Sequence, residues 1–419
     1  MKKERRKFWT YPWGYRESFT IAFAILLIGF LIEYFSQANA IYLPRWPYNL
    51  LLIIVFLAYV LLSYKMVKHP VIRWLSGVPA AISSITVMTL LVLLMGFIPQ
   101  SSETGGSFIT DIGLTHLTKS WPYLLISFYL LLILAFTIMR RIVPLKVKNI
   151  AFTLNHAGLW IVIAAASLGS ADMKKFTMQL VEDKAVFTAY DKYGQPRQMN
   201  FAVKLLDFHI KEYPASIGLL DEHKGDLKFD KKADLMLVEE GTEVEMVNWT
   251  ILIEKYYDAA VRDSADGYRP MNRPGAAHLA YVKATNLNTD TMKEGWVTNG
   301  SFMMSPKYLR LGDGHSAVMT VPRPREYSSD FRFFRGMEDY EDVTIKVNKP
   351  ATIDGWTFYQ TGYNEKMGKW SQVSIVEIVK DPWLPVVYTG IFMILLGSLY
   401  LVWMGRTKNT KKQVQDDLV

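Results

Sequence analysis

One of the seven histidines in the sequence lies inside an apolar stretch long enough to cross a membrane. This residue, His156, stands in the segment Asn155-His156-Ala157-Gly158, about eight residues after Lys148. An ionisable ring within a bilayer is costly and usually serves a function. A neutral imidazole is a good axial ligand for haem iron, and an apolar pocket suits a porphyrin. The alternative is a packing histidine that bonds to a neighbouring carbonyl.

The other histidines give weaker indications of a site. His116 lies before the fourth apolar stretch, near Asp111 and Lys119, where it is either a haem or metal ligand or a surface residue. His69 is predicted to lie on the surface. The remaining four show no metal-ligand spacing, so no metal site is expected in the soluble part of the chain: His209, His223, His278 and His315.

Motifs of ordinary enzymes are missing from the sequence. It has no Gly-rich phosphate loop, no H-E-x-x-H helix and no G-x-S-x-G elbow. It also has no cysteine, which excludes a C-x-x-C redox pair, a cysteine nucleophile and an iron–sulfur cluster. We therefore expect at most an accessory role in catalysis.

The apolar residues gather in six stretches, each near the 20 or so residues that a bilayer about 30 Å thick requires. The second, from Tyr48 to Tyr64, is the shortest. Ala165 and Gly169, four residues apart in the fifth, predict a close-packing face. The fold class predicted is a multi-pass α-helical membrane protein with six transmembrane helices, at about residues 17–36, 48–64, 80–98, 121–139, 150–169 and 385–404.

The positive charges predict the orientation of these helices, because Lys and Arg in short connections remain in the cytoplasm. They cluster before residue 17, at 65–73, at 140–148 and after residue 405, whereas the opposite connections carry only Arg45 and Lys119. Both termini are therefore predicted to be cytoplasmic. The predicted parts are a cytoplasmic N-terminus (1–16), a five-helix membrane domain (17–170), an extracytoplasmic domain (171–382), a sixth helix (383–405) and a cytoplasmic tail (406–419).

The formal net charge of +8 does not predict a nucleic-acid partner. Residues 171–382 hold 28 Lys and Arg against 32 Asp and Glu, so the large external domain is slightly acidic. The excess positive charge lies at the cytoplasmic edges of the helices, where it is a topology signal. The lipid bilayer is the expected surroundings of the chain.

The external domain is predicted to be mainly β. Apolar residues alternate along Phe201–Leu205 and 373–379, and turns are expected at Asp191–Gly194 and Asp354-Gly355. Two segments rich in Pro, Gly, Arg and aromatic residues, about 257–275 and 312–336, are predicted to be long loops. These loops either pack in contact with solvent or form a surface that binds a partner or an anionic ligand group. The candidates for that surface are Arg323, Arg325 and Arg332.

Several segments together resemble the ResB/CcsB family of cytochrome c biogenesis proteins. The resemblance spans roughly residues 150–405, with a large outside domain between two helices. It is carried by Asn155–Leu159, Phe201–Pro214, Val347–Pro350, Asp354–Tyr363 and the closing Asp381-Pro382 before one helix.

The resemblance implies a subunit of the system II machinery in the inner membrane, with its large domain periplasmic. Such a subunit works with a CcsA-type partner to export haem b and present it to apocytochrome c, and His156 matches the family's intramembrane haem ligand. The tryptophan-rich segment of CcsA is missing, and five helices precede the external domain where many members have three. A small-solute transporter and a ligand-free envelope sensor or scaffold remain alternatives.

Overall fold

A computed structural model describes most of the chain. The described residues are 9–36, 41–63, 69–100, 107–143, 146–223, 225, 235–263 and 267–404. Most of the positive charges on which the orientation was predicted, namely those in 2–7, at 65 and 68 and in the tail 406–419, lie outside these ranges.

The chain forms two compact units. One contains residues 1–173 and 381–419, and the other contains residues 174–380. The boundaries predicted for the external domain, 171 and 382, lie close to this division. The first unit is helical and the second is built from β-strands, so a mainly β domain inserted between two helices is observed as predicted.

The helices of the first unit follow the predicted apolar stretches closely. Four of them have a proline in the first turn, where its missing N–H costs nothing. The helices are α1 (Tyr15–Phe35), α2 (Tyr48–Ser63), α3 (Pro70–Leu75), α4 (Val78–Phe97), α5 (Phe108–Asp111), α6 (Trp121–Ile142), α7 (Ile150–Gly169) and α8 (Leu384–Met404), with short 3-10 turns η2 (Leu114–Lys119) and η3 (Val147–Asn149).

Among the described residues, five helices are long and apolar enough to cross a membrane: α1, α4, α6, α7 and α8. Helix α2 has 16 residues. At 1.5 Å per residue it is about 24 Å long, which is shorter than the hydrocarbon core of a bilayer. The chain therefore has the helices of a membrane protein, and a sixth span at α2 stays a prediction.

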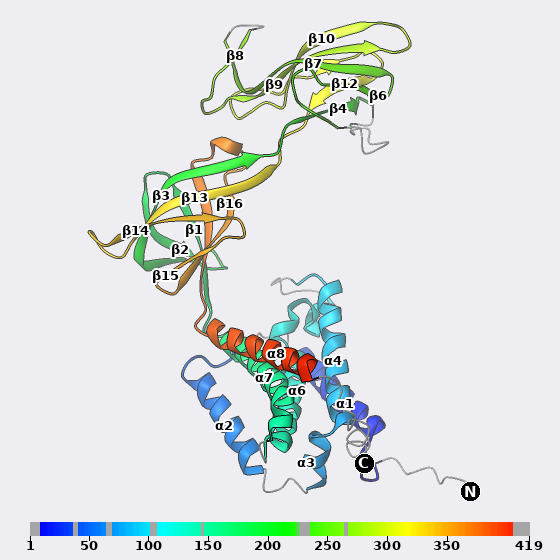
Figure 1. Cartoon of the computed structure of the whole chain (residues 1–419), viewed down its shortest axis with the longest axis vertical. Helices are drawn as coiled ribbons and strands as arrows, with labels where there is room; N and C mark the ends of the chain where they lie inside the picture. Colours follow the sequence, from blue (N-terminus) through cyan, green and yellow to red (C-terminus); the bar gives the residue numbers. More distant parts are fainter. Residues whose placement is uncertain are drawn as a thin grey trace. The chain divides into compact units, whose positions relative to one another are not determined.

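Helices α7 and α8 pack side by side (Figure 1) at glycine contacts. A Cβ atom on Gly158 would lie 2.6 Å from the carbonyl oxygen of Gly390, and one on Gly390 would lie 2.7 Å from the carbonyl oxygen of Gly158. Only hydrogen at these positions lets the two backbones meet. The Ser398 hydroxyl donates a 3.0 Å hydrogen bond to Asn155 Oδ1 across the same interface. Ala165 is buried as predicted, and Gly169 contacts Trp383.

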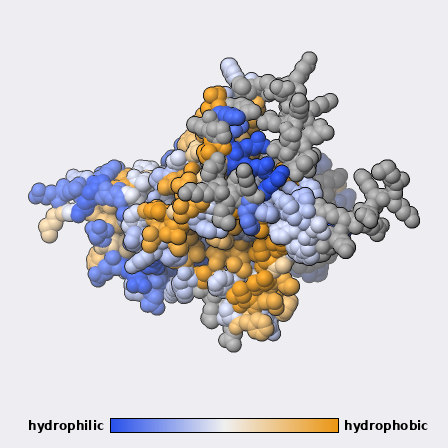
Figure 2. Space-filling view, turned by 90° about the horizontal axis from the view of Figure 1, so that it is seen from below, coloured by the Kyte–Doolittle hydropathy of each residue, from blue (hydrophilic) through white to orange (hydrophobic). Residues whose placement is uncertain are grey.

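The outward faces of these helices are apolar. On α8, Phe392, Leu395, Leu396 and Leu399 are all more than half exposed. Apolar side chains also gather in broad patches on the face of the molecule seen in Figure 2. Exposing these apolar side chains to water would be unfavourable in free energy, whereas lipid tails could cover them without that penalty.

An eight-stranded antiparallel sheet carries one apolar core of the second unit, in the order β14-β13-β3-β2-β1-β17-β16-β15. The predicted alternation is confirmed, since Phe201, Val203 and Leu205 point inward and are at most 7% exposed. The predicted turns at 191–194 and 354–355 join neighbouring strands. The strands are β1 (Lys174–Val181), β2 (Ala185–Tyr190), β3 (Pro196–Glu212), β13 (Pro324–Phe334), β14 (Tyr340–Lys346), β15 (Ala351–Ile353), β16 (Trp356–Tyr363) and β17 (Val373–Lys380).

Two smaller sheets enclose a second apolar core of the same unit, around Trp249, Ile251 and Val282. One is ordered β10-β9-β7-β6, with β8 beside β7, and the other β11-β12-β4-β5. Their strands are β4 (Ser216–Asp221), β5 (Met236–Leu237), β6 (Glu243–Met246), β7 (Trp249–Arg262), β8 (Tyr268–Pro270), β9 (Ala277–Asn286), β10 (Met292–Thr298), β11 (Leu309–Arg310) and β12 (His315–Met319); the short turn η4 (Gly368–Trp370) precedes β17.

The prediction of two long loops at 257–275 and 312–336 is wrong for much of their length. Residues 257–262 continue β7, and residues 324–334 form β13. Phe331 and Phe333 are fully buried in the core of the large sheet. The clustered aromatic residues at 331–334 thus stabilise the domain, while Arg332 between them points to the opposite face.

Candidate functional site

His156 lies in the second turn of α7, and its ring is fixed from within the helix. Nδ1 lies 2.9 Å from the carbonyl oxygen of Phe152, one turn earlier. A carbonyl oxygen only accepts, so Nδ1 must carry the proton and donate it. In the neutral imidazole Nε2 is then the unprotonated nitrogen, and among the described residues it has no hydrogen-bond partner. This is the tautomer that presents a lone pair to a metal.

An aromatic ring and a cation lie beside the imidazole. The rings of Phe152 and His156 stack with their centroids 3.8 Å apart and 21° between their planes. The guanidinium carbon of Arg141, in the last turn of α6, lies 5.3 Å from the centre of the Phe152 ring. The Asn149 amide donates to the Arg141 carbonyl and so joins the end of α6 to the start of α7. The group offers a nitrogen ligand, the edge of an aromatic ring and a positive charge, which suit the iron, the apolar macrocycle and the propionates of haem.

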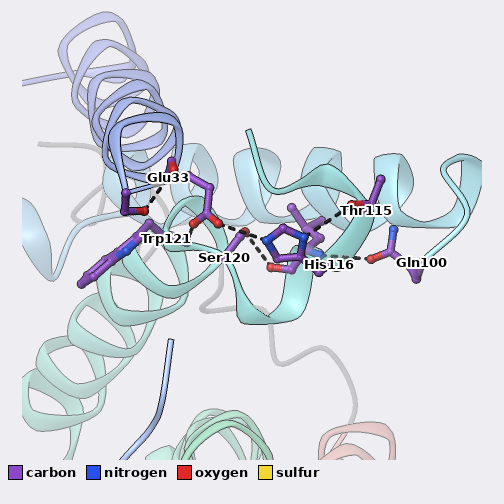
Figure 3. A network of polar contacts seen from close by, with 8 residues as sticks. Glu33, Gln100, Thr115, His116, Ser120 and Trp121 are labelled. Atoms are coloured by element: carbon purple, nitrogen blue, oxygen red, sulfur yellow. Dashed lines mark hydrogen bonds and ion pairs between the residues drawn. The ribbon is translucent and has the colours of Figure 1, made fainter. Parts of the chain in front are cut away.

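His116 has a different setting, at the start of α6, shown in Figure 3. Its Nε2 donates to Glu33 of α1 at 3.1 Å, and the second carboxylate oxygen of Glu33 accepts the backbone N–H of Trp121 at 2.8 Å. The Glu33 side chain is fully buried and that of His116 is 16% exposed. His116 is thus not an exposed loop residue, and its role as a ligand stays a prediction.

The hydrogen bonds of Glu33 account for the burial of its carboxylate without a catalytic role. Trp121 is the first residue of α6, and the residue before it, Ser120, makes no side-chain cap. The carboxylate of Glu33 satisfies a free N–H there and complements the positive end of the helix dipole. Gln100 supports the arrangement by bonding to the carbonyl of Leu114 and the N–H of Leu117. The network therefore fastens α1 and η2 to α6.

The two candidate histidines do not share a site. His116 lies five residues before α6, while His156 stacks on the Phe152 ring that Arg141 contacts near the other end of α6. Twenty-two residues separate the ends of that helix, which corresponds to about 33 Å. One iron atom cannot take both as axial ligands.

A third cluster, which the sequence did not reveal, joins α2, α7 and α8 at Asp172. The carboxylate accepts hydrogen bonds from the backbone of Trp46, the amide of Asn49 and the indole of Trp383, at 2.7 to 2.8 Å. Burial alone would raise the pKa of Asp172, but these bonds and the charge of Arg45 lower it. Asp172 is therefore a charged anchor that attaches α2 to the paired helices.

The three arginines predicted to face a partner are not equivalent. Arg323 and Arg325 are exposed on either side of Pro324, at the start of β13. Arg332 binds both carboxylate oxygens of Asp342, at 2.6 and 2.8 Å, across β13 and β14. Its charge is already paired, so Arg323 and Arg325 are the better candidates for contact with an anion. Among the described residues, no group of three His, Cys, Asp or Glu could hold a metal ion.

Comparison with known families gives one match. The family described as ResB-like matches residues 280–375, which run from β9 to β17. This confirms the predicted resemblance over that segment and links the chain to cytochrome c biogenesis. No curated protein matches the sequence.

Proposed function

Taking the ResB-like segment at 280–375 as the premise, we propose that this chain is a subunit of the system II machinery for cytochrome c biogenesis. With a CcsA-type partner it moves haem b across the inner membrane and presents it to apocytochrome c. Haem is the cargo of this subunit and not a resident cofactor. The chain itself supplies binding and orientation, and covalent attachment takes place in the complex with the partner.

The tautomer of His156 is the observation that supports this proposal. The bond from Nδ1 to the Phe152 carbonyl leaves Nε2 as a lone pair beside an aromatic ring and a cation. Fixing the ring through its other nitrogen is how proteins orient histidine ligands of metals. A packing histidine would make the same bond to a neighbouring carbonyl, so the proposal rests on the lone pair of Nε2 and on the groups near it.

The rival function of a small-solute transporter predicts several polar groups along a path in the membrane. Besides His156, the sequence offers Glu33 and Asn155. Glu33 caps α6, while Asn155 bonds to the Ala151 carbonyl and to Ser398 of α8. Both are engaged in helix packing, so neither supports a solute path.

Deletion of the chain from its own cell tests the function. We expect c-type cytochromes to lose covalent haem, seen as loss of haem-stained bands on a denaturing gel, while b-type cytochromes keep their spectra. Reintroducing the wild-type chain should restore the bands. Normal haem-stained bands in the deletion strain would contradict the proposal and favour a transporter, sensor or scaffold.

We further propose that the β unit is periplasmic and that both termini are cytoplasmic, which requires α2 to cross the membrane. Alkaline phosphatase inserted after Asn288, in the exposed turn between β9 and β10, should be active. The same reporter at the N-terminus or after Lys412, outside the described residues, should be inactive. Activity at one terminus alone would show that an odd number of helices cross and that α2 does not.

A further inference from the structure

A pocket of about 440 Å³ opens at one end of the eight-stranded sheet. Its walls come from the start of β1, the end of β17, the turn between β15 and β16, the start of β16, residues of β3 and the residue that follows β13. The side chains that matter are Lys174, Lys380, Arg335, Asp354, Trp356 and Phe201. All of them belong to the β unit, whereas His116 and His156 belong to the helical unit.

Two lysines lie directly opposite each other in this pocket. Lys174 and Lys380 are Cα partners in the antiparallel pairing of β1 with β17, so their side chains emerge on the same face. Like charges in this position are destabilising. Lys175, the next residue, forms a 2.7 Å ion pair with Glu377, and among the described residues no such partner is found for Lys174 or Lys380. An anion between the two ammonium groups would relieve their repulsion.

The acidic residue of the pocket is already engaged. Asp354 accepts a 2.8 Å hydrogen bond from Arg335, which Asp339 and Glu341 also hold at 3.3 and 2.9 Å. Three carboxylates surround the one guanidinium, so Arg335 has no charge left for an anion, and these contacts fix the rim of the pocket. The two lysines are therefore the groups that remain to receive a ligand.

Aromatic rings complete the pocket. Trp356 is 8% exposed and packs with Phe201, their centroids 5.9 Å apart, and Lys380 Nζ lies 5.7 Å from the Trp356 ring centre. A wall with tryptophan and lysine side by side is typical of protein surfaces at the level of lipid headgroups.

The chain itself keeps these lysines near the membrane. Four residues separate Gly169, the last residue of α7, from Lys174, and three separate Lys380 from Leu384, the first residue of α8. Fully extended, these connections span at most about 17 Å and about 14 Å. Chain length alone therefore limits how far either lysine can be from the end of a membrane helix, whatever the arrangement of the two units.

We propose that this pocket binds a phosphate group, and specifically the headgroup of an anionic phospholipid. The two ammonium groups bind the phosphate as point charges, and the exposed edges of the otherwise buried Trp356 and Phe201 border the glycerol. Such a contact would seat the β unit on the anionic membrane surface. The proposal does not depend on haem binding.

Native mass spectrometry of the full-length chain in detergent, with equal amounts of phosphatidylglycerol and phosphatidylcholine, tests the site. The wild type should retain phosphatidylglycerol in preference to phosphatidylcholine. Lysines near an anionic surface each strengthen binding about fivefold, so Lys174→Gln with Lys380→Gln should weaken it roughly 30-fold. Lys174→Arg with Lys380→Arg should preserve the preference, which separates loss of charge from loss of folding.

The matched control removes two exposed lysines elsewhere in the β unit, Lys184→Gln with Lys293→Gln, and should behave as the wild type. Equal lipid preference in both double variants would overturn the proposal. Excess inorganic phosphate distinguishes the source of the ligand. If it leaves the bound lipid in place, the whole headgroup is the ligand. If it displaces the lipid, the two lysines bind phosphate from either source, and the specific assignment to a lipid headgroup is overturned.

Discussion

Replacing His156 with alanine is expected to abolish most cytochrome c maturation while the protein remains in the membrane at its normal level. The substitution removes the only iron ligand that the Phe152–His156–Arg141 group offers. Removing a residue that hydrogen-bonds to a metal ligand already lowers metal affinity about 10–100-fold. Removing the ligand itself should therefore lower it at least about 100-fold. Haem-stained cytochrome bands in a strain complemented with His156→Ala measure the effect.

Added imidazole should partly restore maturation in the same strain. The alanine leaves space of the right size beside Phe152, and a small aromatic molecule can fill an engineered cavity. His69→Ala provides the control, because it removes a histidine that lies just before α3, outside this group. If His156 only packs against a neighbour, His156→Ala will lower the amount of protein and imidazole will restore nothing.

A leucine in place of Gly158 is expected to separate α7 from α8. The new Cβ atom would meet the Gly390 carbonyl oxygen at 2.6 Å, and backbone cannot move aside as a flexible side chain can. Overpacking of this kind costs about 3 kcal/mol. The expected result is a lower midpoint of thermal unfolding in detergent, and lost maturation because His156 is two residues away.

Gly96→Leu is the matched control for this prediction. Gly96 is also a glycine of an apolar helix, but a Cβ atom added there would meet nothing within 4 Å. It should therefore keep the wild-type midpoint. Equal midpoints for Gly158→Leu and Gly96→Leu would mean that the close contact between α7 and α8 contributes little to stability.

The helices were predictable because each needs only a long apolar run, which local sequence displays. The β domain was predictable where apolar and polar residues alternate, as at 201–205. The same alternation exists at Phe331, Arg332 and Phe333, two buried phenylalanines around an outward arginine. It was missed because the prolines and arginines just before it resemble those of a loop.

The surroundings of the site were harder to predict, since they depend on contacts between distant residues. His156 was identified from its position in an apolar helix, but its tautomer follows from a bond to Phe152 that only the folded helix reveals. Glu33 and His116 are 83 residues apart, and no local pattern indicates that they meet. The Asp172 anchor likewise joins residues 126 and 211 positions away.

The absorption spectrum of the purified full-length chain with its CcsA-type partner tests the central claim most directly. We expect a Soret band in the wild-type complex and a pyridine haemochrome spectrum of haem b. Both should be lost or greatly reduced in the His156→Ala complex, at equal protein and partner content, and should be restored in part by imidazole. A colourless wild-type complex that supports maturation, or an unchanged Soret band in the variant, would contradict the assignment of His156 as a haem ligand.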